Sequence, residues 1–228
     1  ALDGISNAPQ LQLLSAEGTH VQDFGATDEH DHGDEDHDEA KAEEGHEEHG
    51  EEDHDHKGTD PHAWLDPANA THWLGLIAAD LSKLDPDTAA TYAANATAAQ
   101  TQITALDAEL AATLAPVKDH PFVVFHDAYG YLTAHYGLTV AAKISDGDAA
   151  APGAKQIAEV QEILAKGPTC LHPEANHDDK LAVQLAEATG AKLGAPLDPE
   201  GSTFVAGPTV YADLMHGLAK SLADCAAN

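Results

Sequence analysis

Residues 122–132 read FVVFHDAYGYL, and this stretch indicates the fold. Its opening, Phe122 to Phe125, is a short and wholly apolar run of the kind that forms a strand buried on both faces. His126 follows directly, and the residues after it predict a helix. A buried strand that passes at once into a helix is typical of a parallel sheet covered by helices.

The rest of the C-terminal half repeats this alternation. Apolar runs and helical periodicity predict strands at residues 138–144, 170–171 and 192–197, and helices at residues 153–166, 178–189 and 209–225. Strands and helices in alternation imply a mostly parallel sheet flanked by helices. We therefore predict an α/β fold for this half of the chain.

A long helix is predicted ahead of this region. Pro67 follows Asp66 at a helix start, and Asp85-Pro86 breaks that helix and restarts it, with Asp85 as the N-cap. Apolar residues then recur every three or four positions for about thirty residues, which is about 45 Å of helix. So long a helix suits a spine between two lobes. We expect three parts: the remainder of an N-terminal lobe at 1–84, the linking helix at 85–115 and a C-terminal lobe at 116–228.

A tract rich in histidine and acid interrupts the N-terminal part at residues 28–59. From Asp28 to His56 it holds seven His and sixteen Asp or Glu against one Lys, and nothing apolar larger than alanine. Such a segment cannot bury enough surface to offset the entropy of ordering it, so we expect a disordered insertion. Its histidines predict metal binding, and a merely solubilising loop is the alternative. These histidines are His30, His32, His37, His46, His49, His54 and His56.

The net charge of −30 limits the partners. Phosphate binding needs clustered Lys and Arg, so nucleic acid is not expected as a partner, and an anionic membrane surface is disfavoured. No run of eighteen apolar residues is present, so we expect no membrane insertion. A cationic ligand fits this charge best.

Two cysteines, Cys170 and Cys225, lie in the last third of the chain, too far apart for a CxxC pair. They are either unrelated buried thiols or one disulfide, and the sequence pattern leaves both open. A disulfide would indicate an oxidising compartment such as the periplasm.

Three residues at element boundaries predict a metal site. His126 follows a strand, and open α/β sheets bind ligands at the carboxyl ends of their strands. His62, in DPHAWLDP at 60–67, precedes a helix start, and Asp198 follows another strand. Two imidazoles and a carboxylate suit a transition metal if folding brings them together. The alternatives are a capping or surface role for His62 and a packed core role for His126.

The other histidines outside the tract carry less of this signal. We expect His135, His172, His177 and His216 to be isolated surface residues. Glu174 follows the third predicted strand, and we expect it to orient a ligand rather than bind metal. No HExxH, GxSxG, Walker A or GxGxxG motif is present.

A series of motifs resembles the zinc-specific solute-binding proteins of ABC uptake systems, the ZnuA family. In order these are DPHAWLDP at 60–67, a long helix, FVVFHDAYGYL at 122–132, PGA at 152–154, TCLHPEA at 169–175, LDPEG at 197–201 and a terminal cysteine. The likeness covers nearly the whole chain. It implies two α/β lobes with mostly parallel sheets, joined by one long rigid helix, with the metal between the lobes.

The resemblance also implies roles for individual residues. His62 and His126 match zinc ligands, and Glu174 supports the site. Asp198 matches a carboxylate that binds metal in manganese-binding relatives. Those relatives have a carboxylate at the position of His126, and imidazole suits zinc better. The family pattern also implies a Cys170–Cys225 disulfide.

The function implied by the resemblance is that of a monomeric, non-catalytic periplasmic protein. It captures Zn²⁺ with high affinity and delivers it to an ABC permease in the inner membrane, and the tract collects zinc at lower affinity. The family's remaining histidine ligand precedes everything in this chain, so we expect the opening of the first lobe to be absent.

Two alternatives stay open. One is a manganese or iron binder on the same scaffold. The more distant one is a zinc-dependent hydrolase, with the metal on His62, His126 and Asp198 and with Glu174 as the base. No motif pairs a base with the metal, which disfavours the hydrolase.

Overall fold

The computed structural model describes residues 9–25, 58–145, 147, 151–167 and 170–227. The tract from Asp28 to His56 lies outside the described residues, so the prediction that it is disordered stays untested. The segments on either side of it pair with each other. Asp23 and Thr59 form an antiparallel bridge, and the Asp60 N–H donates to the Gln22 carbonyl at 2.9 Å. The described segments before and after residues 26–57 therefore lie side by side.

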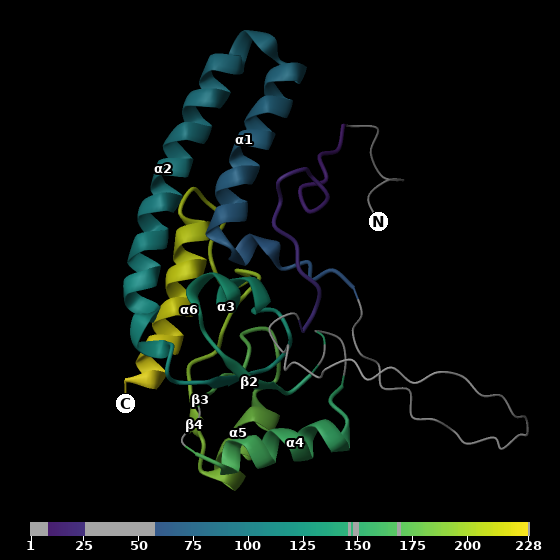
Figure 1. Cartoon of the computed structure of the whole chain (residues 1–228), viewed down its shortest axis with the longest axis vertical. Helices are drawn as coiled ribbons and strands as arrows, with labels where there is room; N and C mark the ends of the chain where they lie inside the picture. Colours follow the sequence, from purple (N-terminus) through teal and green to yellow (C-terminus); the bar gives the residue numbers. More distant parts are fainter. Residues whose placement is uncertain (1–8, 26–57, 146, 148–150, 168–169, 228) are drawn as a thin grey trace, which may run out of the picture.

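Two long helices, α1 (Pro67–Leu84) and α2 (Ala89–Leu114), run antiparallel as a tall hairpin (Figure 1). Asp66 caps α1, because its Oδ1 accepts a hydrogen bond from Ala68 N at 2.8 Å and proline follows at the first helical position. The 26 residues of α2 span about 39 Å. The predicted helix start at Pro67 and the long second helix are both confirmed.

The restart between these helices differs from the prediction. The Asp85 side chain makes no capping hydrogen bond, and a 3₁₀ turn, η2 (Pro86–Thr88), precedes α2. Asp85 Oδ2 instead accepts a hydrogen bond from the Tyr92 hydroxyl at 3.3 Å. Asp85 therefore marks the break, but its expected role as a side-chain N-cap is wrong. None of the helices in the described ranges is both long and apolar enough to cross a membrane.

Four short parallel strands form the sheet, in the order β2-β1-β3-β4. Their bounds are β1 (Phe122–Val124), β2 (Val140–Lys143), β3 (Cys170–Leu171) and β4 (Lys192–Leu193). β1 has a neighbour on each side and is buried throughout, which explains its wholly apolar sequence. The predicted α/β class is confirmed, whereas the division into two lobes joined by α2 stays a prediction.

Helices cover both faces of this sheet, and their bounds are α3 (Gly130–Tyr136), α4 (Ala154–Ala165), α5 (Lys180–Thr189) and α6 (Val210–Ala226). α4 and α5 lie together on one side of the sheet (Figure 1), and their apolar side chains pack with Val123 in one core cluster. On the other, Phe122 and Val124 join the larger core, which α2, α3 and α6 complete. Alternate residues of β1 therefore face two different helical layers.

The fourth strand is shorter than its predicted range of 192–197. Pro196 on this segment and Pro173 on the neighbouring one have no N–H to donate, which interrupts the ladder between them. Pairing resumes where Leu197 forms a parallel bridge with Glu174. This brings Glu174 and Asp198 to adjacent positions at the carboxyl ends of β3 and β4.

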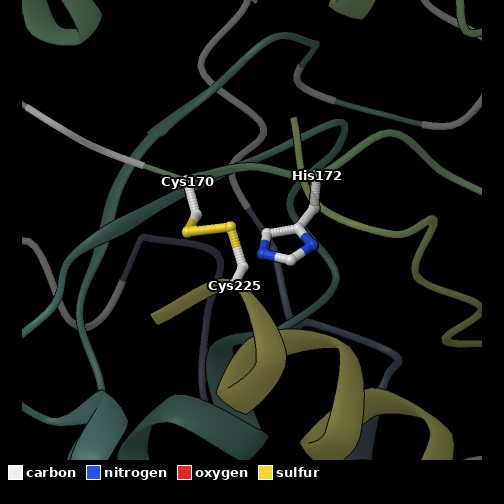
Figure 2. Close-up of side chains that lie close together, drawn as sticks. All are labelled: Cys170, His172 and Cys225. Atoms are coloured by element: carbon white, nitrogen blue, oxygen red, sulfur yellow. A yellow bond between two sulfur atoms is a disulfide. The ribbon is translucent and has the colours of Figure 1, made fainter. Parts of the chain in front are cut away.

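A disulfide joins Cys170 in β3 to Cys225 in the last turn of α6, with the sulfur atoms 2.04 Å apart (Figure 2). The crosslink connects the middle of the sheet to the C-terminal helix across 55 residues of sequence. The pairing that the family resemblance implies is confirmed.

Candidate metal centre

Two buried imidazoles, His62 and His126, face each other beyond the carboxyl end of β1. Their ring centroids lie 5.4 Å apart and their planes are inclined by 58°. His62 precedes the 3₁₀ turn η1 (Ala63–Leu65), and His126 comes two residues after β1. The side chains are 11% and 3% exposed, so both are withdrawn from bulk water.

A carboxylate holds the Nδ1 of each ring. His62 Nδ1 donates to Asp60 Oδ1 at 2.7 Å, and His126 Nδ1 donates to Glu174 Oε2 at 2.5 Å. A neutral imidazole with its proton on Nδ1 has its lone pair on Nε2. Zinc-binding histidines use this arrangement, in which the carboxylate fixes the tautomer and the ring orientation.

The spacing of the two rings fits a shared zinc ion. With Zn–N distances of about 2.0–2.1 Å and tetrahedral angles, two imidazoles bound through Nε2 have centroids roughly 5.2 Å apart. The observed separation is 5.4 Å. The centroid separation of His62 and His126 is therefore compatible with two imidazoles bound to one zinc ion.

Backbone contacts fix the position of the His62 segment. The Asp60 carboxylate accepts a second hydrogen bond from the His62 N–H at 2.9 Å, and the Asp60 carbonyl accepts one from the Tyr131 hydroxyl at 2.9 Å. Trp64 Nε1 donates to the Pro199 carbonyl at 2.9 Å. The His62 loop is thus attached to α3 and to the segment that follows β4.

Asp198 is almost buried beside this centre, but its carboxylate is occupied. Oδ1 accepts hydrogen bonds from the N–H and hydroxyl of Ser202, and Oδ2 accepts from the N–H and hydroxyl of Thr203. Burial alone would raise the pKa of Asp198, but these four hydrogen bonds outweigh it and lower the pKa. The carboxylate is therefore anionic at neutral pH, and both of its oxygens already accept hydrogen bonds.

Asp198 does not join the two imidazoles in a tight cluster. In the described part of the chain, the group of three or more His, Cys, Asp or Glu whose ligand atoms all lie within 4.8 Å of one another is Cys170, His172 and Cys225. Metal binding by Asp198 stays a prediction. Glu174, by contrast, makes the contact with His126 that its predicted supporting role requires.

Two residues near the centre were missed by sequence reasoning. Asp60 was not singled out, although its position two residues before His62 is a usable signal. His177 was expected on the surface, but it is half-buried and stacks on Phe125 with the ring centroids 4.3 Å apart. A turn in which the His177 N–H donates to the Glu174 carbonyl brings this third imidazole within 6.4 Å of His126.

The remaining histidines lie elsewhere. His216 is exposed, as expected. His135 contacts two carboxylates, with Nδ1 3.0 Å from Asp66 Oδ1 and Nε2 2.9 Å from Asp107 Oδ1. The expected surface position of His172 is wrong, because its side chain is fully buried beside the disulfide (Figure 2). It follows β3 in the interior, where strand residues alternate between two covered faces.

The chain matches known zinc-uptake proteins. A family profile described as "ZnuA: Zinc-uptake complex component A periplasmic" matches residues 9–225. The high-affinity zinc uptake system protein ZnuA of Paracoccus denitrificans is 52% identical over 169 residues, which cover 74% of this chain and 52% of that protein. The chain thus spans about half the length of the curated relatives that it matches.

Solved structures give the same fold. A crystal structure of ZnuA aligns with a TM-score of 0.61 at 26% identity, covering 74% of this chain and 61% of that one. The solute-binding protein FpvC of Pseudomonas aeruginosa in complex with Mn²⁺ aligns with a TM-score of 0.64 at 25% identity, covering 75% and 62%. The profile spans nearly the whole chain, and the chain therefore belongs to the ZnuA family.

Proposed function

We propose that this chain is part of a periplasmic protein that binds Zn²⁺ for an ABC uptake system and passes it to the permease in the inner membrane. The observation that carries the proposal is the His62–His126 pair, in which a buried carboxylate holds each Nδ1 and the ring spacing suits one zinc ion. The Paracoccus relative, named a high-affinity zinc uptake protein, supports the same cargo. We expect a monomer without catalytic activity.

The two imidazoles come from segments far apart in the sequence. His62 lies before α1 and His126 after β1, and non-covalent contacts alone hold the two segments together in the described structure. A small separation of these segments would remove one ligand from the ion. Such a site can hold zinc tightly and still release it, which a transport protein requires.

Two residues, Asp198 and His177, are candidates for further ligands of the zinc ion. Asp198 requires loss of at least one of its four hydrogen bonds before an oxygen can bind metal. His177 already lies 6.4 Å from His126, about 1 Å beyond the centroid spacing of two imidazoles on one zinc ion. Rotation of the His177 side chain on its turn would bring a third imidazole to the ion.

The ligand types favour zinc over manganese. Neutral imidazole binds Zn²⁺ well, whereas Mn²⁺ is better matched by carboxylate and water oxygens. A structural relative was crystallised with Mn²⁺, so the scaffold accommodates either metal. We assign the selectivity of this chain to the two imidazoles.

The histidine-rich tract is proposed to supply zinc at lower affinity. Seven histidines lie between Asp28 and His56, outside the described residues. The flanking segments meet at the Asp23–Thr59 bridge, next to Asp60, which holds His62. Deletion of residues 28–57 should leave the tightest zinc site intact but reduce the total zinc bound. Unchanged stoichiometry after the deletion would contradict this role.

Zinc affinity measured by competition with a chromophoric chelator tests the main proposal. His62→Ala and His126→Ala should each weaken the tightest site more than about 100-fold, because each removes one of few ligands from a buried ion. His216→Ala is the matched control, since His216 is exposed and lies on α6 away from the pair. Tight binding that survives both pair substitutions would rule out this site.

The hydrolase alternative gains no support from the geometry. Glu174 would have to be the general base, but its Oε2 accepts the hydrogen bond from His126 Nδ1. A carboxylate that orients a metal ligand in this way is not placed to take a proton from metal-bound water.

A further inference from the structure

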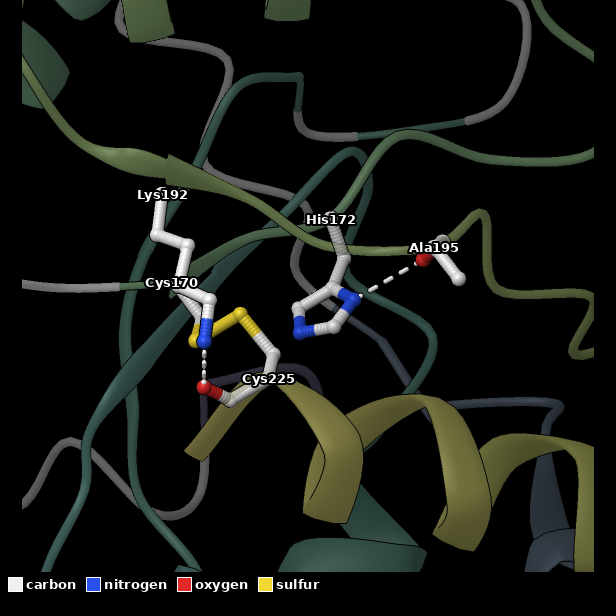
Figure 3. Close-up of a disulfide and its surroundings, with 5 residues drawn as sticks. All are labelled: Cys170, His172, Lys192, Ala195 and Cys225. Carbon is white, nitrogen blue, oxygen red and sulfur yellow. Dashed lines mark hydrogen bonds between the residues drawn. A yellow bond between two sulfur atoms is a disulfide. The ribbon is translucent and has the colours of Figure 1, made fainter. Parts of the chain in front are cut away.

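His172 has an unusual environment for a buried imidazole. Its Nδ1 donates to the Ala195 carbonyl at 2.9 Å (Figure 3). Its Nε2 is fully buried and has no hydrogen-bond partner in the described part of the chain. A buried ring nitrogen without a partner costs free energy, so its retention calls for an explanation.

The ring occupies a space that the neighbouring strand leaves open for it. A Cβ atom on Gly194 would lie 2.3 Å from the His172 ring, so a larger residue at that position would displace the imidazole. The Nε2 side of the ring faces the disulfide (Figure 3). The ligand atoms of Cys170, His172 and Cys225 all lie within 4.8 Å of one another.

We propose that reduction of the Cys170–Cys225 disulfide turns this corner into a second zinc site, formed by two thiolates and the Nε2 of His172. The disulfide takes two electrons and two protons from a dithiol, which is itself oxidised to a disulfide. Binding of Zn²⁺ then releases the two thiol protons to solvent. Thiol–disulfide exchange with another disulfide, which takes up two electrons and two protons and becomes a dithiol, re-forms the Cys170–Cys225 bond, removes two of the three ligands and releases the Zn²⁺.

The backbone already has the dimensions of such a site. With Zn–S distances of about 2.3 Å, two thiolates on a tetrahedral zinc ion lie roughly 3.8 Å apart. The Cα atoms of Cys170 and Cys225 are 6.1 Å apart, and rotation of the side chains suffices to separate the sulfur atoms to that spacing. Cys170 and His172 are two residues apart at the end of one strand, so their side chains lie on the same face.

The surroundings favour both the ligands and the metal. Burial lowers the pKa of His172, and the proton on Nδ1 is held by Ala195, so Nε2 has a lone pair available. Lys192 Nζ donates to the Cys225 carbonyl, which places a positive charge beside the cysteines and favours thiolates over thiols (Figure 3). Cys225 lies in the last turn of α6, where the helix dipole favours a cation.

The absorption spectrum of bound Co²⁺ tests this proposal on the full chain. Thiolate ligands give Co²⁺ an intense charge-transfer band in the near ultraviolet, which imidazole and carboxylate ligands do not give. The chain has only two cysteines, so this band reports only this corner, even with metal bound elsewhere. Neither His62 nor His126 takes part, so the result is independent of the proposed uptake function.

The oxidised chain should show no band. After reduction with a phosphine, saturating Co²⁺ should produce it, and excess Zn²⁺ should remove it. His172→Phe keeps a ring in the same space and should weaken Co²⁺ binding in the reduced chain at least about 10-fold. Gly194→Ala should have a similar effect by displacing the ring, and His216→Phe should have none.

A reduced chain that keeps its circular dichroism and shows no band would overturn the proposal. If reduction unfolds the chain, Zn²⁺ should restore the circular dichroism of the native form, because metal binding then contributes to folding. Failure of Zn²⁺ to do so would also overturn it. A charge-transfer band of equal strength in His172→Phe would show that His172 is not a ligand and would overturn the proposed site.

Discussion

Two places in this molecule bring histidine together with further polar or sulfur-containing groups, and they differ in what holds them. The His62–His126 pair is positioned by hydrogen bonds that the two imidazoles donate to the carboxylates of Asp60 and Glu174. The Cys170–Cys225 corner is closed by a covalent bond between β3 and α6, with His172 packed against it. Hydrogen bonds at the His62–His126 pair can break and form again, whereas the Cys170–Cys225 corner changes only when the disulfide bond is reduced.

This difference separates the two proposed sites by how each would exchange a zinc ion. In the proposed His62–His126 site, a carboxylate fixes the orientation of each imidazole before an ion binds. In the corner, the sulfur atoms are bonded to each other, and the site does not exist under oxidising conditions. Substitutions should therefore affect zinc binding at the pair and the stability of the whole chain at the corner.

The largest effect is expected from removal of the disulfide. Cys170→Ala with Cys225→Ala should lower the free energy of unfolding by about 4 kcal/mol, because the crosslink closes a long loop in the unfolded chain. Urea unfolding of the zinc-free protein measures this change. The zinc affinity of the His62–His126 pair should stay within about threefold of its original value. If the loss of zinc binding free energy at the His62–His126 pair were as large as the loss of unfolding free energy, zinc binding at the pair would depend on the disulfide.

A change of ligand type at the pair is the next test. His126→Asp replaces an imidazole with a carboxylate, so Zn²⁺ affinity should fall about 100-fold while Mn²⁺ affinity falls less or rises. Calorimetric titration of both metals into wild type and variant gives the ratio of affinities. The same ratio in both proteins would show that His126 does not determine selectivity.

The carboxylates behind the two rings should have smaller effects. Asp60→Asn and Glu174→Gln keep the shape of each side chain but remove its charge, and each should weaken zinc binding about 10–100-fold. Asp198→Asn is the informative comparison, because Asp198 has no contact with either ring in the described structure. If Asp198→Asn lowered zinc affinity more than Glu174→Gln does, Asp198 would have to bind the metal directly.

Much of the fold could be predicted because its signals are local. The apolar run of β1, the proline after Asp66 and the helical spacing of α2 each depend on neighbouring residues. The fourth strand was predicted, but its early end at Leu193 was not, because that end depends on two prolines in different segments. The positions of His62 and His126 followed from their places at element boundaries.

Contacts between distant segments could not be read from the sequence. The burial of His172 depends on the space left by Gly194, and the position of His177 depends on its stacking against Phe125. His135 is a third example, since its two partners are Asp66, the N-cap of α1, and Asp107 on α2. Each of these histidines looks isolated along the chain, because Gly194, Phe125 and the two aspartates lie more than 20 residues from the histidines that they contact.

The smallest effect is expected at the Asp66–His135 pair, which has no part in either site. The hydrogen bond to Asp66 is the main cause that raises the pKa of His135 above its ordinary value of 6.5. The pKa of Asp66 is lowered from 3.8, since its hydrogen bonds to His135, His20 and the backbone outweigh the opposing effect of burial. The raised pKa of His135 gives stability that is complete below pH 6.5 and is lost as the pH rises through the folded pKa.

The lowered pKa of Asp66 gives stability that is present above pH 3.8 and is lost in acid, so the pair contributes most between these values. We expect His135→Gln to cost on the order of 0.5–1 kcal/mol at pH 6 and less at pH 9. Urea unfolding with a chelator present measures the free energy of unfolding at both pH values without interference from zinc. His216→Gln is the control, because His216 is exposed and its Glu109 contact is long, at 3.6 Å. A cost of His135→Gln that does not change with pH would mean that the ring contributes by packing rather than by charge.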